Sequence, residues 1–235
     1  MPSKALWLLT PSKSDQARLK LLQAALLIFG DKGMQGASVR EIAKAAGQNV
    51  AAIAYYFGSK EKLYHAVVEG LVREVRHHMA DVVVEMARLR SQTQPDRTEC
   101  LRVLKLFLRS IFLRVLSRKE ALPIARLIVR EQMGPTPGFE ILYQQGFREL
   151  HEGLCFLVGA ILDQDPRDRN VILRTHMLMG QVYFFAMSRE AILRRLGWST
   201  LEGENAEIVV RLLDENLDTL LTALQHKKPA RTELK

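Results

Sequence analysis

Apolar residues recur at the 3.6-residue period of an α-helix along nearly the whole chain, and this periodicity limits the possible folds more than any other feature. No segment has the strict alternation of apolar and polar residues that is typical of a half-buried β-strand. We therefore expect an all-α protein. Capping residues, glycines and prolines divide the pattern into about nine helices, which should span about residues 12–32, 38–46, 49–58, 59–90, 96–117, 119–133, 139–162, 168–196 and 201–224.

Explicit capping signals define the short helices early in the chain. Ser38 and Glu41 have the spacing of a capping box, and Asn49 is a suitable N-cap for the next helix. Gly33 and Gly58 should end the first and third helices, because glycine adopts the backbone conformations that terminate a helix. The sequence therefore predicts two short helices joined by a tight turn.

The positive charge of the chain is concentrated at its N-terminal end. The formal net charge is +8, and residues 1–60 hold eight Lys or Arg against three acidic residues. A basic region of this kind favours a polyanionic partner, either a nucleic acid or an anionic membrane surface.

Cysteine content and hydropathy indicate the compartment. Cys100 and Cys155 are the two cysteines of the chain, without a pairing framework or metal-type spacing, which fits a reducing environment. Residues 5–9 form the longest apolar run near the N-terminus, too short for a signal peptide, and no later run approaches membrane-spanning length. We therefore expect a cytosolic protein without a cofactor.

The stretch GQNVAAIAYYFGSKEKLY, which begins at Gly47, carries the most specific pattern. On a helical wheel of residues 50–57, Ile53 and Phe57 fall on one side, while Ala51 and Tyr55 occupy the centre of the opposite side. The first side can pack on the preceding short helix, and the second is small and nearly smooth. A smooth helix can enter a major groove closely, so the pattern favours a DNA-binding helix-turn-helix over a helical hairpin with a surface tyrosine.

The segment FGDKGMQGASVREIAKAAGQNVAAIAYYFGSKEKLYHAVV resembles the DNA-binding region of TetR-family transcriptional regulators, over roughly residues 15–65. The run YYF-x-SKE-x-L and the spacing G-x-x-x-x-S-x-x-x-I-A-x-x-A-G carry the resemblance. The later stretches VREQMGPTPGFE and RTHMLMGQVYFFAMSREAILRRLGW are similar to the CecR-like subgroup. The resemblance implies a helix-turn-helix domain at residues 12–58 and a larger helical effector-binding and dimerisation domain at 59–225. A flexible arm at 1–11 and a basic flexible tail at 226–235 flank these two domains.

The resemblance also implies contacts to double-stranded DNA. Arg40 matches a position that often reaches a guanine edge, which suits the bidentate guanidinium. Lys60 matches a phosphate-binding position and lies at a helix N-terminus, where free amide groups favour an anion. Ala54 departs from the family, which frequently has tyrosine there. The implied DNA-binding residues are Arg40, Gln48, Asn49, Val50, Ala51, Tyr55, Tyr56 and Lys60.

Two apolar seams in the last helices suit packing between two subunits. One follows 4-3-4 spacing and the other 4-3 spacing, and both could alternatively face the core of their own subunit. Since the family pairs these helices across a two-fold axis, the resemblance favours a homodimer. The implied dimerisation residues are Met179, Tyr183, Ala186, Leu213, Leu217, Leu220 and Leu224.

Aromatic and polar residues alternate in the middle helices, where the family encloses a small-molecule effector. Side chains of these types at helical spacing also form ordinary hydrophobic cores, so the pattern leaves both readings open. The candidate ligand-binding residues are Phe107, Met133, Phe147, His151, His176, Gln181 and Phe184.

The residues also allow two other classes of protein. A di-iron helical bundle needs two E-x-x-H pairs, and the chain offers one, Glu74 with His77, which is easily read as a solvated pair. No nucleophilic triad or phosphate-binding glycine loop stands out, so we expect neither an enzyme nor a bound metal. A membrane-surface protein would use the basic N-terminal helix instead.

The interpretation that combines these features is a ligand-responsive transcriptional regulator. We expect a repressor that binds a palindromic operator as a dimer and is released by a small-molecule effector. The resemblance to the CecR-like subgroup suggests that it controls export or drug-tolerance genes.

Overall fold

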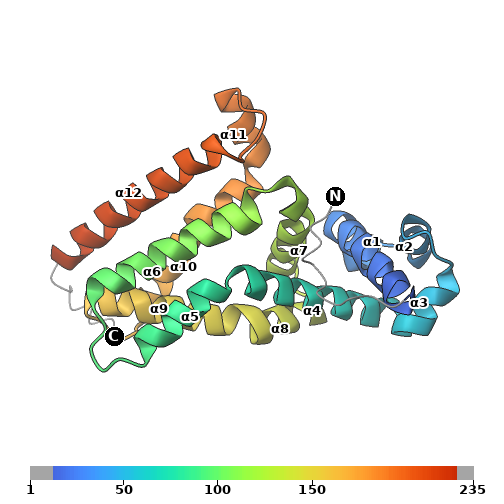
Figure 1. The fold of residues 1–235 in the computed structure, drawn as a ribbon, viewed down its shortest axis with the longest axis horizontal. Coiled ribbons are helices and arrows are strands. Elements are labelled where there is room, and N and C mark those ends of the chain that lie inside the picture. Colours follow the sequence, from blue (N-terminus) through green and yellow to red (C-terminus); the bar gives the residue numbers. More distant parts are fainter. Residues whose placement is uncertain (1–12, 227–235) are drawn as a thin grey trace, which may run out of the picture. The chain divides into compact units, whose positions relative to one another are not determined.

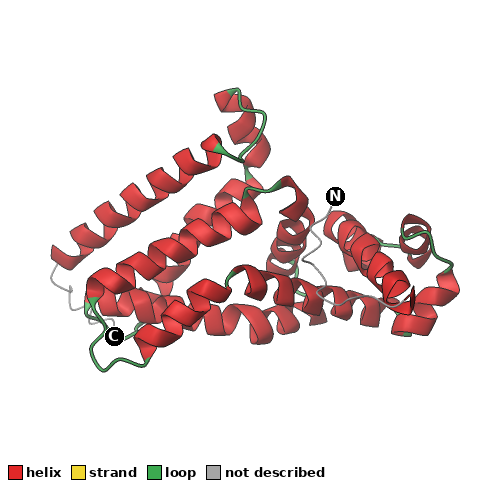
Figure 2. Cartoon of the chain, in the orientation of Figure 1, coloured by secondary structure: helices red, strands yellow, loops and turns green. Residues whose placement is uncertain are grey.

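The computed structural model describes residues 13–226, and all regular secondary structure in this range is helical (Figure 2). The all-α prediction is therefore confirmed. The expected N-terminal arm lies outside the described residues, as does the expected tail beyond residue 226. None of the helices between residues 13 and 226 combines the length and the hydrophobicity needed to span a bilayer.

The chain forms two compact units, each built from two segments. The first contains the residues up to His78 together with Arg118–Glu149, and the second contains Met79–Ser117 together with the residues from Leu150 onward. The expected DNA-binding helices therefore share a unit with a later part of the chain, which the predicted boundary at residue 58 did not anticipate.

The first unit is an assembly of helices around one hydrophobic core. It contains α1 (Lys13–Gly36), α2 (Val39–Ala45), α3 (Val50–Phe57), α4 (Lys60–His78), α7 (Leu122–Met133) and α8 (Pro137–Leu142) (Figure 1). Short 3-10 and π-helical segments, Lys119–Ala121 and Tyr143–Phe147, precede α7 and follow α8. Helix α1 packs on both α4 and α7, and α4 packs on α8.

Ser38 and Asn49 cap α2 and α3 as the sequence predicts, but the Glu41 carboxylate contacts Lys32 and does not complete the expected capping box. The Ser38 hydroxyl accepts a hydrogen bond from the Arg40 N–H at 3.2 Å, and the Asn49 side-chain oxygen accepts one from the Ala52 N–H at 2.8 Å. Gly33 (φ 71°) interrupts α1, and Gly58 (φ 80°) ends α3. Both have positive φ, a conformation that glycine adopts at little cost, so these two glycines are required by the turns.

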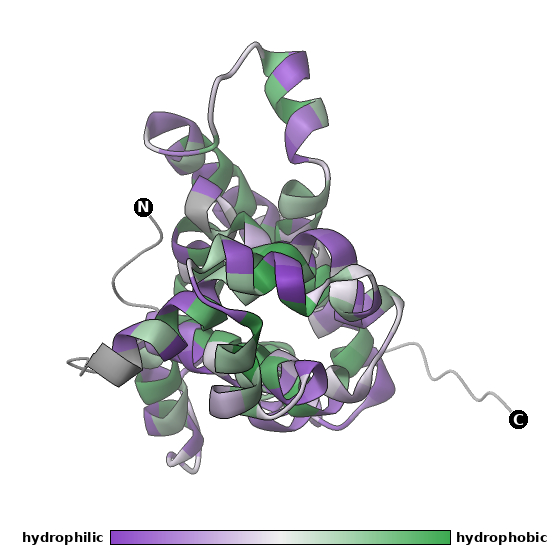
Figure 3. Ribbon diagram, turned by 90° about the vertical axis from the view of Figure 1, so that its right-hand side faces the viewer, coloured by the Kyte–Doolittle hydropathy of each residue, from purple (hydrophilic) through white to green (hydrophobic). Residues whose placement is uncertain are grey.

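The second unit is a helical bundle. It contains α5 (Ala80–Arg90), α6 (Arg97–Ile111), a π-helical turn (Phe112–Leu116), α10 (Arg169–Met187), α11 (Arg189–Leu196) and α12 (Glu204–His226), with most of α9 (Arg148–Leu162). Helix α12 packs on α6 and α10. Hydrophobic and hydrophilic residues alternate along individual helices, as amphipathic helices require (Figure 3).

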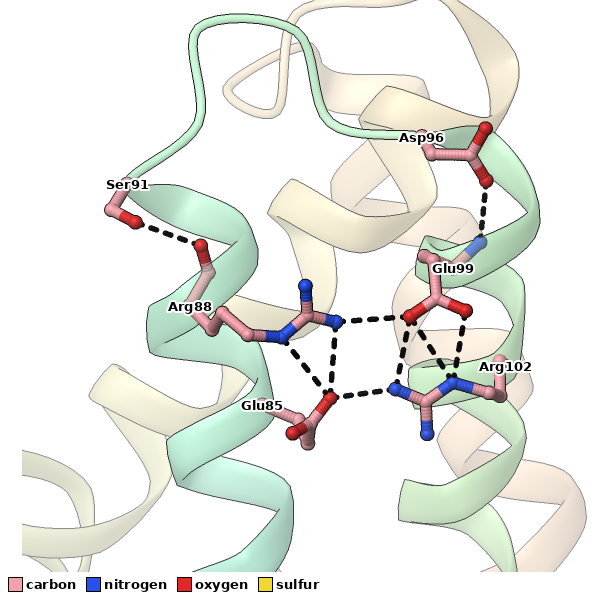
Figure 4. A network of polar contacts seen from close by, with 6 residues as sticks. All are labelled: Glu85, Arg88, Ser91, Asp96, Glu99 and Arg102. Carbon is pink, nitrogen blue, oxygen red and sulfur yellow. Dashed lines mark hydrogen bonds and ion pairs between the residues drawn. The ribbon is translucent and has the colours of Figure 1, made fainter.

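An ion-pair network joins α5 to α6 next to their connecting loop (Figure 4). Arg88 and Arg102 each contact both Glu85 and Glu99, at distances of 2.6 to 3.1 Å. The two arginines lower the pKa of Glu85 and of Glu99 by donating hydrogen bonds to their carboxylates. Because these side chains are solvent-accessible, the network links α5 to α6 but contributes little to stability.

Four helices that the sequence predicts as continuous are interrupted. The expected helix 59–90 breaks at Met79 (φ −105°, ψ 8°), and the expected helix 168–196 breaks at Ser188 (φ −101°, ψ 17°). The expected helices 96–117 and 139–162 contain the π-helical segments Phe112–Leu116 and Tyr143–Phe147. The periodicity did not reveal these interruptions, because a break at one residue or a single wide turn shifts the apolar stripe only slightly.

Candidate nucleic-acid interface

Helices α2 and α3 form a helix-turn-helix whose inner residues are buried. Ile53 and Phe57 of α3 are 3% and 7% exposed, and Ile42, Ala43 and Ala46 of the preceding helix and turn are also buried in the same core. This burial fixes the rotation of α3 about its axis. The opposite side of α3 therefore has to face outward.

The outward side of α3 is small apart from one aromatic residue. Ala51 and Ala54 are exposed, Val50 is 43% exposed, and Tyr55 is 81% exposed. The ring of Tyr55 lies edge-on to that of Tyr56, with ring centroids 4.9 Å apart. An exposed tyrosine between alanines gives a surface that can approach a major groove closely and still offer one hydroxyl.

The polar residues expected to contact DNA surround this side of α3. Arg40 lies exposed in the first turn of α2, and Gln48 is half-buried in the turn between the two helices. The Asn49 side-chain oxygen is engaged in capping α3. Lys60, in the first turn of α4, donates from Nζ to the Ala37 carbonyl at 3.3 Å, and its ammonium retains two further donors.

Arg18 of α1 is a candidate contact that sequence reasoning missed. Its guanidinium lies over the Phe57 ring, 5.4 Å from the ring centroid, at the C-terminal end of α3. This cation–π contact places an exposed positive charge beside the recognition helix. Arg18 and Phe57 are far apart in the sequence, so no local pattern predicts their contact. Only the basic charge of α1 could have indicated that Arg18 is a candidate.

Two ion pairs involve charged residues of the basic region. Lys32 contacts Glu41 at 2.5 Å, and Asp31 lies 3.8 Å from Arg126. Lys32 and Glu41 both belong to residues 1–60, and Asp31 is itself an acidic residue of that region, so neither pair reduces its basic excess. Arg18 and Lys60 place part of this excess beside α3 and at the start of α4.

The candidate ligand-binding residues are divided between the two units. Met133 and Phe147 belong to the first unit and the other five to the second. Met133 is 79% exposed and Phe184 is 63% exposed, whereas Phe107 is 1% exposed. This corrects the assignment of Met133 and Phe184 to an enclosed pocket, because their side chains lie on the surface.

His151 and His176 lie near each other in the second unit, with ring centroids 6.0 Å apart. Burial, together with the charge of His176, lowers the pKa of His151. Its Nδ1 lies 3.6 Å from the Cys155 sulfur, while its Nε2 is buried without a hydrogen-bond partner. These two histidines, with the half-buried Gln181, remain the predicted polar part of an effector site.

Two of the predicted dimerisation residues on α12 are buried in the core of their own subunit. Leu213 and Leu217 are 5% and 1% exposed within the single chain. On α10, burial raises the pKa of Tyr183 to about 12, and Met179 and Ala186 are half-buried. Leu213 and Leu217 therefore belong to the side of α12 that faces the core. Leu220 and Leu224 remain accessible.

A second set of apolar residues on α10 and α12 is exposed, and it shares Leu220 with the predicted seam. On α10 it follows 4-3-4-3 spacing and contains Gly180, where an added Cβ would meet no atom within 4 Å. This exposed apolar face consists of Leu173, Met177, Phe184 and Met187, with Ile172, on α10 and of Ile208, Leu212 and Leu220 on α12.

The E-x-x-H pair does not behave as a solvated pair. Glu74 is 4% exposed, and its carboxylate lies 3.0 Å from Nε2 of His78 rather than from His77. Within residues 13–226, no group of three or more His, Cys, Asp or Glu side chains is arranged to hold a metal ion. Glu74 therefore has a structural partner one helical turn away.

Known proteins match both halves of the chain. Residues 21–67 match bacterial regulatory proteins of the tetR family, and residues 102–224 match the C-terminal domain of the HTH-type transcriptional dual regulator CecR. The HTH-type transcriptional dual regulator CecR of Shigella flexneri is 36% identical over 217 residues, which cover 92% of this chain and 96% of the relative. The HTH-type transcriptional repressor NicS of Pseudomonas putida is 30% identical over 102 residues, which cover 43% and 44% of the two chains.

Solved structures share the fold over nearly the full length. HlyIIR, a hemolysin II transcriptional regulator, superposes with a TM-score of 0.58 at 21% identity, covering 92% of this chain and 100% of that chain. A transcriptional regulator from Rhodococcus sp. Rha1 gives a TM-score of 0.53 at 17% identity, covering 90% and 99%.

An N-terminal helix-turn-helix with a smooth outer face, on a helical chain similar to known regulators, defines a DNA-binding transcriptional regulator and not an enzyme. The chain belongs to the TetR family of bacterial regulatory proteins, and its C-terminal domain is of the CecR type.

Proposed function

We propose that the protein acts as a dimeric repressor that binds a palindromic operator and is released by a small-molecule effector. The exposed face of α3 carries the proposal, because Ala51, Ala54 and Tyr55 leave the helix free to enter a major groove. The repressor function draws support from the relative NicS, which is named a transcriptional repressor. We expect the protein to act in the cytoplasm, where its operator would be accessible.

The exposed apolar face of α10 and α12 supports the dimer. Exposed large apolar residues on neighbouring helices are typical of protein–protein interfaces, and the 4-3-4-3 spacing on α10 suits packing of helices against one another. We propose that two copies of this face meet across a two-fold axis, with Gly180 allowing close approach of the two α10 helices. A two-fold dimer presents two copies of α3, which explains why a palindromic operator is expected.

The effector and the regulated genes are the remaining parts of the proposal. We propose that an effector with an apolar body and one or two polar groups binds in the second unit near His151, where Nε2 has no partner. Genes for export or drug tolerance are proposed as targets from the resemblance to the CecR-like subgroup.

Selection of duplexes from a random-sequence pool tests operator binding directly. The purified protein should enrich an inverted repeat, and mapping of its binding sites on the host chromosome should recover the same repeat. Enrichment of a sequence without two-fold symmetry would contradict a palindromic operator. Binding to anionic vesicles without enrichment of any duplex would favour a membrane-surface protein.

Arg40→Ala should weaken binding to the selected duplex by about 1–3 kcal/mol and relax the sequence preference at one position in each half-site. The physical reason is that a guanidinium on the first turn of α2 can read a guanine through two hydrogen bonds. Titration of a panel of single-base variants of the duplex measures the effect. Uniform weakening across the panel would show that Arg40 does not read a base.

Lys60→Ala should weaken binding to all duplexes about equally and reduce the slope of affinity against salt, because a phosphate contact carries no sequence information. Titrations at several salt concentrations measure that slope. Lys119→Ala removes an exposed lysine from the segment before α7 and serves as the matched control. An unchanged salt slope for Lys60→Ala would contradict the phosphate contact.

A further inference from the structure

A buried carboxylate lies where helices of the first unit meet. Glu131 is in the last turn of α7, is 1% exposed, and is absent from the DNA contacts proposed above. A buried charge is costly unless hydrogen-bond donors surround it. Its donors therefore show which parts of the structure it holds together.

Three donors from two places in the chain satisfy the Glu131 carboxylate. The Tyr64 hydroxyl of α4 donates to Oε1, and the Thr136 hydroxyl donates to the same oxygen at 2.8 Å. The Thr136 N–H donates to Oε2 at 3.0 Å. Because Thr136 is also the N-cap of α8, the carboxylate joins α4 to the turn between α7 and α8.

Tyr64 is held in place from the other sides as well. Its ring meets the Phe29 ring of α1 edge to face, with centroids 4.9 Å apart and an angle of 84° between the rings. A Cβ on Gly138 would lie 2.6 Å from Cε1 of Tyr64, so the α8 backbone contacts the ring directly. Burial and the neighbouring Glu131 raise the pKa of Tyr64, which keeps its hydroxyl protonated as a donor.

The neighbouring Arg130 attaches the same end of α7 to α1. Its Nε donates to the Gly30 carbonyl at 3.1 Å, and its terminal nitrogen donates to the Asp31 carbonyl. These carbonyls lie just before the interruption of α1 at Gly33. Two consecutive residues of α7 therefore hold α1 and α4 together.

The position of Tyr64 relates this cluster to DNA binding. Tyr64 lies one helical turn after Lys60, at the end of α4 that follows α3 across Gly58. A helix is rigid over one turn, so fixing Tyr64 also fixes the first turn of α4 and the start point of the α3–α4 connection.

We infer that Glu131 is a positioning residue for operator binding, because its carboxylate holds the N-terminal part of α4, and with it α3, to the α7–α8 turn. This inference rests on the operator binding by α3 proposed above. Residues 118–149 join the second unit at both of their ends. Glu131 thus ties the DNA-reading helices to a segment that continues into the second unit at both ends. This link is additional to the direct connection between α4 and α5.

The test uses Glu131→Gln and Tyr64→Phe in the full-length protein, with the duplex that the wild-type protein selects and a scrambled duplex of equal length. Each variant should bind the selected duplex about tenfold more weakly, because it loses one charge-assisted hydrogen bond. Its affinity for the scrambled duplex should equal that of the wild type. Repeated selection with each variant should enrich half-sites at a wider range of spacings. A purely structural role would lower the melting temperature without changing the spacing preference.

Matched controls separate positioning from stability. Glu140→Gln and Tyr143→Phe make the same chemical changes at exposed positions of the same unit and should bind as the wild type does. Ile128→Val removes a methylene from the same core without touching the hydrogen bonds and should lower stability alone. The inference is overturned if both test variants keep the wild-type affinity and spacing preference. It is also overturned if Ile128→Val shows the weaker binding and the wider spacing expected of the test variants. A wild-type protein that selects no duplex would instead contradict the proposed function.

Discussion

Ala51→Leu should reduce operator binding to the level of non-specific DNA, a loss of about a thousandfold or more, while the protein remains folded. Ala51 is exposed at the centre of the outer side of α3, where its small side chain lets the helix backbone approach the base edges. A leucine there would separate the helix from the groove by its own width. Titration of the selected duplex measures the loss of affinity, and a thermal melt should remain close to that of the wild type.

Ala46→Leu makes the same substitution five residues earlier and should have the opposite effect. Ala46 is 7% exposed and belongs to the core of the first unit, so a larger side chain overpacks this core and should lower stability by about 1–3 kcal/mol. The pair therefore tests the orientation of α3 rather than the composition of the turn. A folded Ala51→Leu protein that keeps its operator affinity would show that α3 does not enter the groove.

Phe184→Glu should convert the dimer to a folded monomer that no longer binds the operator with high affinity. Phe184 is 63% exposed in the single chain, so a carboxylate there is solvated in the monomer. In the proposed dimer the same carboxylate would be buried against apolar side chains without a partner, which costs several kcal/mol. Sedimentation measures the mass of the assembly, and the melting transition reports whether the subunit is folded.

Val84→Glu and Leu217→Glu are the exposed and the buried controls for Phe184→Glu. Val84, on α5, is 65% exposed, so the same charge at similar exposure should leave the dimer intact. Leu217 is 1% exposed, so glutamate at this position should unfold the subunit rather than dissociate a folded pair. A Phe184→Glu protein that sediments as the wild-type dimer would place the interface elsewhere.

Local chemistry made the helix-turn-helix predictable from the sequence. The Ser38 and Asn49 N-caps and the Gly33 and Gly58 turns depend on residues a few positions apart, and all four form, although Gly33 interrupts α1 rather than ending it. The outward direction of Ala51 also followed from the helical period alone. Features that involve residues only a few positions apart can be predicted from the sequence, because backbone geometry rather than tertiary packing determines them.

Features that depend on distant segments could not be read in this way. The helical period on α12 identified apolar seams, but it does not distinguish a side that packs within the subunit from one that remains exposed, so Leu217 was assigned wrongly. The sequence predicts that Glu74 and His77 form a solvated pair. In the structure Glu74 is buried and its partner is His78, four residues later. The hydrogen bond from Tyr64 to Glu131 joins residues 67 positions apart, and no local pattern indicates it.

The first unit is discontinuous in sequence, and this has a consequence for how the protein is made. Its core combines Phe29 and Tyr64 with Ile124, Leu127 and Leu142 from the later segment. During synthesis the DNA-reading helices leave the ribosome long before that segment, with the apolar sides of α1 and α4 still uncovered. The recognition helix can therefore reach its final stability only after residue 149 has emerged, so a nascent chain cannot occupy its operator early.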